Sequence, residues 1–137
     1  MYKQTYLIEK DDYNNAGKIS SQLKQTFKQL GFEAPLIRRM AVASYEAEIN
    51  MIIHSLGGEI SVLINEEKVI LSFNDKGPGI VDIEKALTAG YSTASSKARE
   101  FGFGAGMGLP NIKRVSDEFS ITSSPEGTLL EIGFNVS

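Results

Sequence analysis

The stretch Asp75-Lys76-Gly77-Pro78-Gly79 follows directly on the apolar run Val69 to Phe73. Glycine and proline beside an aspartate are typical of a turn, so this stretch predicts the end of a strand. Before it, apolar residues alternate along Ile60 to Ile64, and Asn65-Glu66-Glu67 separates the two runs as a turn would. The sequence therefore predicts a β-hairpin whose second strand ends close to Asp75.

Two helices and a strand are predicted on the N-terminal side of this hairpin. Tyr2 to Glu9 mixes Tyr, Thr, Leu and Ile and favours a strand. The second helix is expected to begin near Pro35, to run to about Ser55 and to stop at Gly57-Gly58. The first helix, which Gly31 ends, is predicted by an apolar stripe of Ile19, Leu23, Phe27 and Leu30. Its candidate N-caps are Asp11, Asp12, Asn14 and Asn15.

Further elements follow on the C-terminal side. Val81 to Ala89 favours a short helix, Gly90 to Gly106 a long polar loop, and Met107 to Val115 another helix. Phe119 to Ser123 and Thr128 to Val136 favour two closing strands. We expect residues 1–137 to form one domain of the α/β (α+β) class. Its fold would be a two-layer sandwich, a mixed, mostly antiparallel sheet covered on one face by helices.

The composition excludes several classes of protein. The 137 residues contain no cysteine, which rules out disulfides, thiolate metal sites and cysteine nucleophiles. The formal net charge is −3, whereas a domain that binds nucleic acid directly is usually basic. No apolar run reaches the ~18 residues of a membrane span, and the N-terminus lacks an apolar signal core. We therefore expect a soluble cytoplasmic protein that binds neither nucleic acid nor membrane.

The first stretch whose side chains could take part in binding or catalysis lies in the second predicted helix. Glu46, Asn50 and His54 are four residues apart and share one helical face. The amide oxygen of Asn50 suits Mg²⁺, and the carboxylate of Glu46 could accept a proton or orient a water molecule. A solvated polar face would show the same spacing, so this stretch alone leaves both interpretations open. A single histidine at a helix end is typically structural.

The second stretch is the turn at Asp75. A carboxylate at a strand end can accept a hydrogen bond from an exocyclic amine such as that of adenine. Gly77 and Gly79 would let a flat ring approach the backbone closely. A plain turn capped by the aspartate is the alternative interpretation.

The third stretch is Gly102-Phe103-Gly104-Ala105-Gly106-Met107-Gly108-Leu109, which leads into a predicted helix. Alternate glycines expose successive backbone N–H groups, and a helix start adds its own, which together suit a phosphate. No Gly-Lys-Ser or Gly-Lys-Thr follows, so the stretch is not a P-loop. A flexible connector remains the alternative.

The order of the three stretches resembles the N, G1 and G2 boxes of the GHKL (Bergerat-fold) ATPase and kinase superfamily. Within it the chain is similar to the anti-sigma-factor serine/threonine kinase family, and most of all to the stressosome switch kinase. The similarity extends from Glu9 to Phe134. The shared features outside the boxes are Asp82-Ile83, Gly90-Tyr91-Ser92-Thr93, Lys113-Arg114 and Asp117-Glu118-Phe119.

The resemblance implies a role for each matched residue, with ATP and Mg²⁺ as cofactors. Asn50 would hold Mg²⁺ between the phosphates, and Glu46 would be the catalytic base or positioner for a serine hydroxyl. Asp75, helped by Thr128, would bind the adenine amine. The remaining nucleotide contacts would come from Gly77 and Gly79 beside the ring and from Gly104, Gly106 and Gly108 around the phosphates.

The resemblance also implies a function. The chain would be an ATP-dependent serine protein kinase and anti-sigma regulatory factor that phosphorylates a small STAS-domain anti-anti-sigma protein. A sigma factor or a phosphatase would be a further partner, and the chain would form a homodimer. One alternative is an ATP-binding partner switch with little kinase activity. Another is a detached histidine-kinase-like ATPase domain, which is disfavoured because no helical segment with an acceptor histidine precedes the domain.

Overall fold

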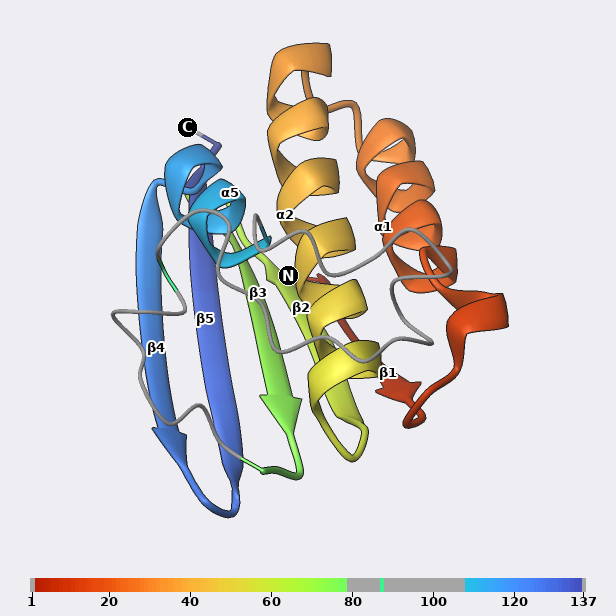
Figure 1. Ribbon diagram of the computed structural model, residues 1–137. Coiled ribbons are helices and arrows are strands. Elements are labelled where there is room, and N and C mark those ends of the chain that lie inside the picture. The colour runs from red at the N-terminus through yellow and green to blue at the C-terminus, as the bar shows by residue number, and fades with distance from the viewer. Residues whose placement is uncertain (1, 79–86, 88–107, 137) are drawn as a thin grey trace.

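A computed structural model describes residues 2–78, 87 and 108–136. Over these ranges the chain forms five strands, three α-helices and one 3-10 turn (Figure 1). In chain order they are β1 (Tyr2–Ile8), η1 (Tyr13–Asn15), α1 (Lys18–Gln29), α2 (Ala34–His54), β2 (Gly58–Ile64), β3 (Lys68–Asp75), α5 (Gly108–Val115), β4 (Glu118–Ser124) and β5 (Gly127–Asn135).

The strands form one sheet in the order β1-β2-β3-β5-β4, and each pairing between described strands is antiparallel. The three helices lie on one face of this sheet, with α2 between α1 and α5 (Figure 1). The predicted two-layer sandwich is therefore confirmed. The predicted helix Val81 to Ala89 and loop Gly90 to Gly106 lie outside the described residues.

The core lies between the sheet and the helices. Strand side chains alternate between the two faces, so one set from each strand is buried against the helices. In β3 the buried set is Val69, Leu71 and Phe73, and in β5 it includes Leu130, Ile132 and Phe134. Two positions continue these series toward the same end of the sheet. They are Asp75 on β3 and Thr128 on β5, which therefore face the helix side.

The start of α1 is stabilised by a carboxylate from α2. The N-cap residue is Gly17, with φ +88°, so the prediction of an Asp or Asn cap is wrong. Glu48, 1% exposed, instead accepts hydrogen bonds from the backbone N–H groups of Gly17 (3.1 Å), Ile19 (3.3 Å) and Ser20 (2.9 Å). The first N–H groups of a helix lack partners within it, and their partial positive charge favours an anion. Glu48 thereby joins α1 to α2.

Replacing Glu48 by alanine is expected to destabilise the protein by about 3 kcal/mol, because three N–H groups lose a charged acceptor. Urea denaturation followed by circular dichroism measures this change. The matched control is Glu46→Gln, two residues away on the same helix, which removes no described hydrogen bond and should not lower the stability. Equal stability of Glu48→Ala and the wild type would contradict the assigned role.

Within residues 2–78, 87 and 108–136, no helix combines the length and the apolarity that crossing a membrane requires.

Candidate functional site

The carboxylate of Asp75 is held by two backbone donors at the end of β3. Its Oδ1 accepts hydrogen bonds from the N–H of Gly77 at 3.0 Å and from the N–H of Thr128 at 2.9 Å. The first of these is the turn cap that the plain interpretation expected. No residue in the described ranges donates to Oδ2, which leaves this oxygen as an acceptor for a ligand.

Two glycines allow neighbouring strands to approach this end of β3. A Cβ on Gly127 would lie 2.1 Å from the backbone oxygen of Asp75, and a Cβ on Gly58 would lie 2.1 Å from the backbone oxygen of Asn74. Both glycines also have positive φ, +155° and +157°. From the sequence, Gly58 is expected only to stop the second helix, and Gly127 only to lie in the turn Pro125-Glu126-Gly127 between the two closing strands. Their spatial role depends on sheet register, which local sequence does not show.

The turn after α2 fixes the backbone that follows Asp75. The N–H of Leu56 donates to the carbonyl of Gly77 at 2.7 Å, and the N–H of Lys76 donates to the carbonyl of Gly57 at 2.9 Å. The end of the helix that carries Glu46 and the predicted adenine-binding turn are therefore joined by a reciprocal pair of backbone hydrogen bonds.

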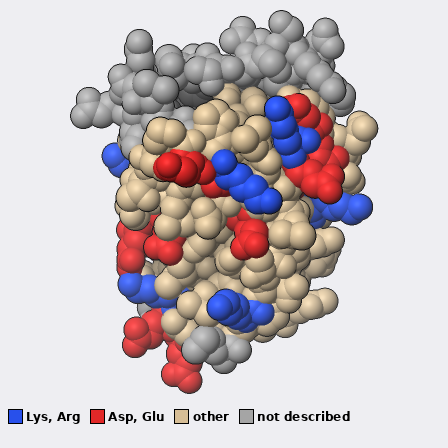
Figure 2. Space-filling view, turned by 90° about the horizontal axis from the view of Figure 1, so that it is seen from below, with Lys and Arg blue, Asp and Glu red and all other residues tan. Residues whose placement is uncertain are grey.

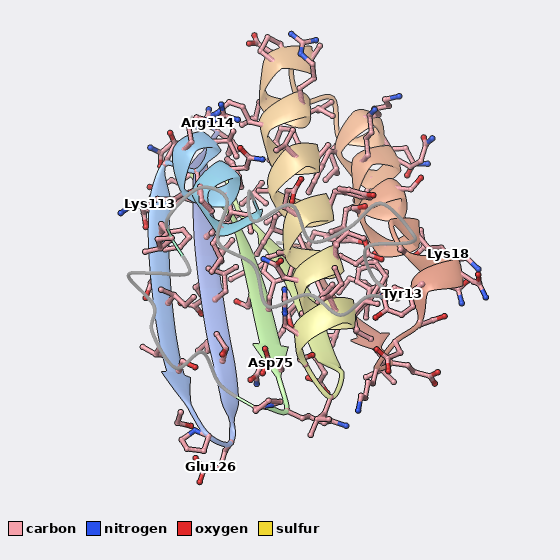
Figure 3. All side chains as sticks on the ribbon, in the orientation of Figure 1. Tyr13, Lys18, Asp75, Lys113, Arg114 and Glu126 are labelled. Carbon is pink, nitrogen blue, oxygen red and sulfur yellow. The ribbon has the colours of Figure 1, made fainter. Side chains whose placement is uncertain are left out.

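Polar groups continue around Asp75 at the lower end of the sheet (Figure 3). The hydroxyls of Ser123 and Thr128 lie 2.8 Å apart, and Thr128 is buried. A hollow of about 340 Å³ adjoins them, lined by Asn74, Asp75, Thr122, Ser123, Ser124, Glu126, Gly127, Thr128 and Leu129. Part of this lining, such as Asn74 and Leu129, lies on the face of the sheet that is turned away from the helices. The helix-side wall of a nucleotide site would come from α2.

The predicted N box and the end of the predicted G2 box meet at Asn50. A Cβ on Gly108, the first residue of α5, would lie 2.9 Å from Oδ1 and 3.0 Å from Nδ2 of Asn50. Only glycine leaves the amide undisturbed there. The structure thus brings together an amide side chain and the N-terminus of a helix, where free N–H groups favour an anion.

Replacing Gly108 by alanine is expected to displace the Asn50 amide while leaving the fold intact. Alanine favours a helix over glycine by about 1 kcal/mol, so loss of helix stability would not explain weaker binding. We expect Mg-ATP affinity to fall about tenfold, roughly the effect of one charged hydrogen bond, and adenosine affinity to stay unchanged. Calorimetric titration with both ligands measures this, and equal weakening of both would contradict the assignment.

Glu46 lies one helical turn before Asn50 on α2 and is half-buried. Burial raises the pKa of its carboxyl above the usual value of 4.5. Among the described residues none forms a hydrogen bond or an ion pair with it. A partly desolvated carboxylate that has no partner among the described residues is suited to act as a base or to orient a hydroxyl.

Lys113 and Arg114 lie away from the predicted site, and His54 has no assigned role in it. Lys113 and Arg114 are exposed at the C-terminal end of α5, opposite to Asp75 in Figure 3. They thus form a solvated face of this helix. Burial lowers the pKa of His54, so its imidazole is neutral near pH 7.

The structure brings the predicted residues into two groups along α2. Asp75, Gly77 and Thr128 form one group, and Asn50 and Gly108 form the other. Gly79, Gly104 and Gly106 lie outside the described residues.

The donor set fits a nucleotide with its divalent cation. Mg²⁺ prefers oxygen ligands and commonly takes one or two from protein beside the substrate phosphates, so the Asn50 amide oxygen is a suitable contribution. The described residues contain no group of three His, Asp or Glu side chains that could hold a metal ion by themselves. The second oxygen of Asp75 fits an exocyclic amine.

Known proteins resemble this chain over most of its length. The family of histidine kinase-like ATPase domains matches residues 10–134. The serine/threonine-protein kinase RsbT of Bacillus subtilis is 35% identical over 109 residues, which are 76% of this chain and 76% of that protein. The anti-sigma F factor of Thermoanaerobacter sp. is 33% identical over 107 residues, which are 72% of this chain and 71% of that protein.

One solved structure adds a likeness in fold. The histidine kinase AdeS of Acinetobacter baumannii matches 100% of this chain and 70% of its own, with a TM-score of 0.55 and 15% sequence identity. At this identity the match concerns the fold alone. The family match and the two relatives, together with the antiparallel sheet covered by helices, establish that the chain belongs to the histidine kinase-like ATPase domain family, in the group that contains RsbT and the anti-sigma F factors.

Proposed function

We propose that the protein is an ATP-dependent serine/threonine protein kinase that phosphorylates a small STAS-domain regulatory protein. It would exchange this partner for a second one, a sigma factor or a phosphatase. The names of the relatives, a serine/threonine-protein kinase and anti-sigma F factors, support this assignment. The observation that carries it is the half-buried carboxylate of Glu46, one turn from Asn50 and without a partner in the described ranges.

Binding of ATP is assigned to two sets of groups. The Oδ2 of Asp75 would accept the adenine amine, while its Oδ1 is held in place by Gly77 and Thr128. The N–H groups at the start of α5 would bind phosphate oxygens. Asn50 would contribute its amide oxygen to Mg²⁺, which neutralises phosphate charge when bound.

Transfer of the phosphoryl group requires little covalent chemistry from the protein. It requires an aligned hydroxyl and stabilised charge on the transferred group. Glu46 would accept a hydrogen bond from the partner's serine hydroxyl and hold it in line. Its raised pKa makes the carboxylate a better proton acceptor than an exposed glutamate.

The surface charge agrees with a protein partner rather than a nucleic acid. On the face seen from below, basic and acidic side chains are interspersed rather than gathered by sign (Figure 2). A net charge of −3 gives no general attraction to phosphodiester backbones.

The test is transfer of labelled phosphate. The tagged protein is incubated with lysate of its native cell in Mg-ATP or Mg-ADP, and proteins retained in only one nucleotide are identified and purified. We expect [γ-³²P]ATP to label one of these proteins on serine, with acid-stable phosphate. Nucleotide-dependent binding without labelling would favour the partner switch with little kinase activity. Acid-labile label would instead indicate a histidine kinase.

A further inference from the structure

Arg39 fixes the end of α5 that is remote from Asn50. Its Nε–H donates to the carbonyl of Val115, the last residue of α5, at 2.9 Å. One of its NH2 groups donates to Oδ1 of Asp117 at 2.8 Å, and its guanidinium lies 5.6 Å from the ring centre of Phe134. Arg39 therefore contacts the helix end, the following turn and the sheet.

Asp117 is itself tied to the sheet. Its Oδ2 accepts a hydrogen bond from the N–H of Asn135 at 2.8 Å, and its own N–H donates to the carbonyl of Gly133 at 2.9 Å. The bond from Asn135 and the Arg39 guanidinium lower the pKa of the Asp117 carboxyl. At neutral pH Asp117 is thus an ionised link between Arg39 and β5.

These contacts define the placement of α5 along α2. Arg39 and Asn50 are about 16 Å apart along α2, at 1.5 Å per residue. Arg39 binds the C-terminal end of α5, and Asn50 lies against Gly108 at its N-terminal end. The two helices therefore run antiparallel and side by side (Figure 1). The contacts of Arg39 with Val115 and Asp117, which we name the α5 anchor, are a polar restraint on α5 at the end opposite to Gly108.

We propose that Arg39 is a positioning residue for phosphate binding. Through the α5 anchor it holds the N-terminus of α5 against Asn50, although it is remote from Gly108 itself. The inference rests on the proposed function. Loss of the anchor removes the polar bonds between α2 and the end of α5 but leaves Asp117 bonded to β5. The end of α5 can then shift relative to α2, and the N–H groups of α5 and the Asn50 amide lose their common geometry. Binding of the adenine ring depends on Asp75 and should be unaffected.

The test compares two ligands on the full chain, Mg-ATP and adenosine, by calorimetry. Arg39→Met keeps an unbranched apolar side chain at this position and removes the guanidinium, with its hydrogen bonds to Val115 and Asp117. Arg38→Met is the matched control, since Arg38 is exposed on the same helix and takes part in none of these contacts. We expect Arg39→Met to weaken Mg-ATP binding about fivefold and adenosine binding less than twofold, because the helix-terminal interaction with phosphate is lost. We expect Arg38→Met to change neither.

Two further variants make the result decisive. Arg39→Lys keeps the charge near Asp117 and should recover part of the Mg-ATP affinity. Asp117→Asn keeps an acceptor for Asn135 and removes the ion pair with Arg39. If Arg39→Met fails to fold, Asp117→Asn should weaken Mg-ATP binding more than adenosine binding in the same way. Equal weakening of both ligands, or no change in either, would overturn the positioning role. A wild-type protein that binds neither ligand would instead overturn the proposed function, and the positioning role with it.

Discussion

Replacing Glu46 by glutamine is expected to slow phosphate transfer to the partner by about 100- to 10,000-fold, the usual range for loss of a general base. Glutamine has nearly the same shape, but its amide cannot accept the proton of a serine hydroxyl. Mg-ATP affinity should stay within about twofold of the wild type, because the residues assigned to adenine and phosphate are unchanged. Single-turnover transfer from [γ-³²P]ATP measures the rate, and calorimetry measures the affinity.

The same variant carries an independent stability signature. Burial raises the folded-state pKa of Glu46, so the ionised carboxylate destabilises the native protein. Glu46→Gln should therefore be more stable than the wild type near pH 7. The difference should shrink as the pH falls through the raised folded-state pKa and vanish below about 4.5, the usual value for the unfolded chain. Unchanged transfer rates in Glu46→Gln would remove Glu46 from the mechanism, whatever its effect on stability.

Replacing Asp75 by asparagine is expected to weaken ATP binding by roughly 30- to 100-fold, the equivalent of 2–3 kcal/mol for a charged hydrogen bond. The asparagine oxygen can keep the hydrogen bonds from Gly77 and Thr128. Its NH2 group then takes the place of Oδ2 and meets the adenine amine, donor against donor. The loss is thus confined to recognition of the base.

Inosine triphosphate provides the control for this substitution. It carries a carbonyl where adenine carries the amine, so the wild type should discriminate against it and Asp75→Asn should accept it better than ATP. Thermal denaturation should show that the variant folds. Equal ATP affinity of Asp75→Asn and the wild type would contradict the adenine assignment.

The main elements of the fold could be predicted because their signals are local. The alternation in Ile60 to Ile64 and Val69 to Phe73 marks the hairpin, and the observed strands extend it by a few residues at most. Pro35 marks the start of the second helix, which begins at Ala34. The helix over Met107 to Val115 is observed as Gly108–Val115.

The contacts that hold the site could not be predicted in this way, because they join residues distant in sequence. Glu48 lies two residues after Glu46 and has no assigned role in the sequence analysis, yet its carboxylate caps α1. The closeness of Gly58 and Gly127 to β3 depends on sheet register, which sequence periodicity leaves open. Arg39 gave no signal, since its partner Asp117 lies beyond β3 and α5. Only the family resemblance predicted that Asn50 and Gly108, in the G2 box, would serve the same phosphate groups.

The central claim is that Asp75 and Asn50 mark the two ends of one adenine nucleotide site. Calorimetric titration of the wild type and Asp75→Asn with Mg-ATP at millimolar concentration tests it most directly. We expect saturable binding with a stoichiometry of one per chain in the wild type and a roughly 30- to 100-fold higher Kd in the variant. Absence of binding heat in the wild type at several temperatures, or equal Kd values for the two proteins, would contradict it.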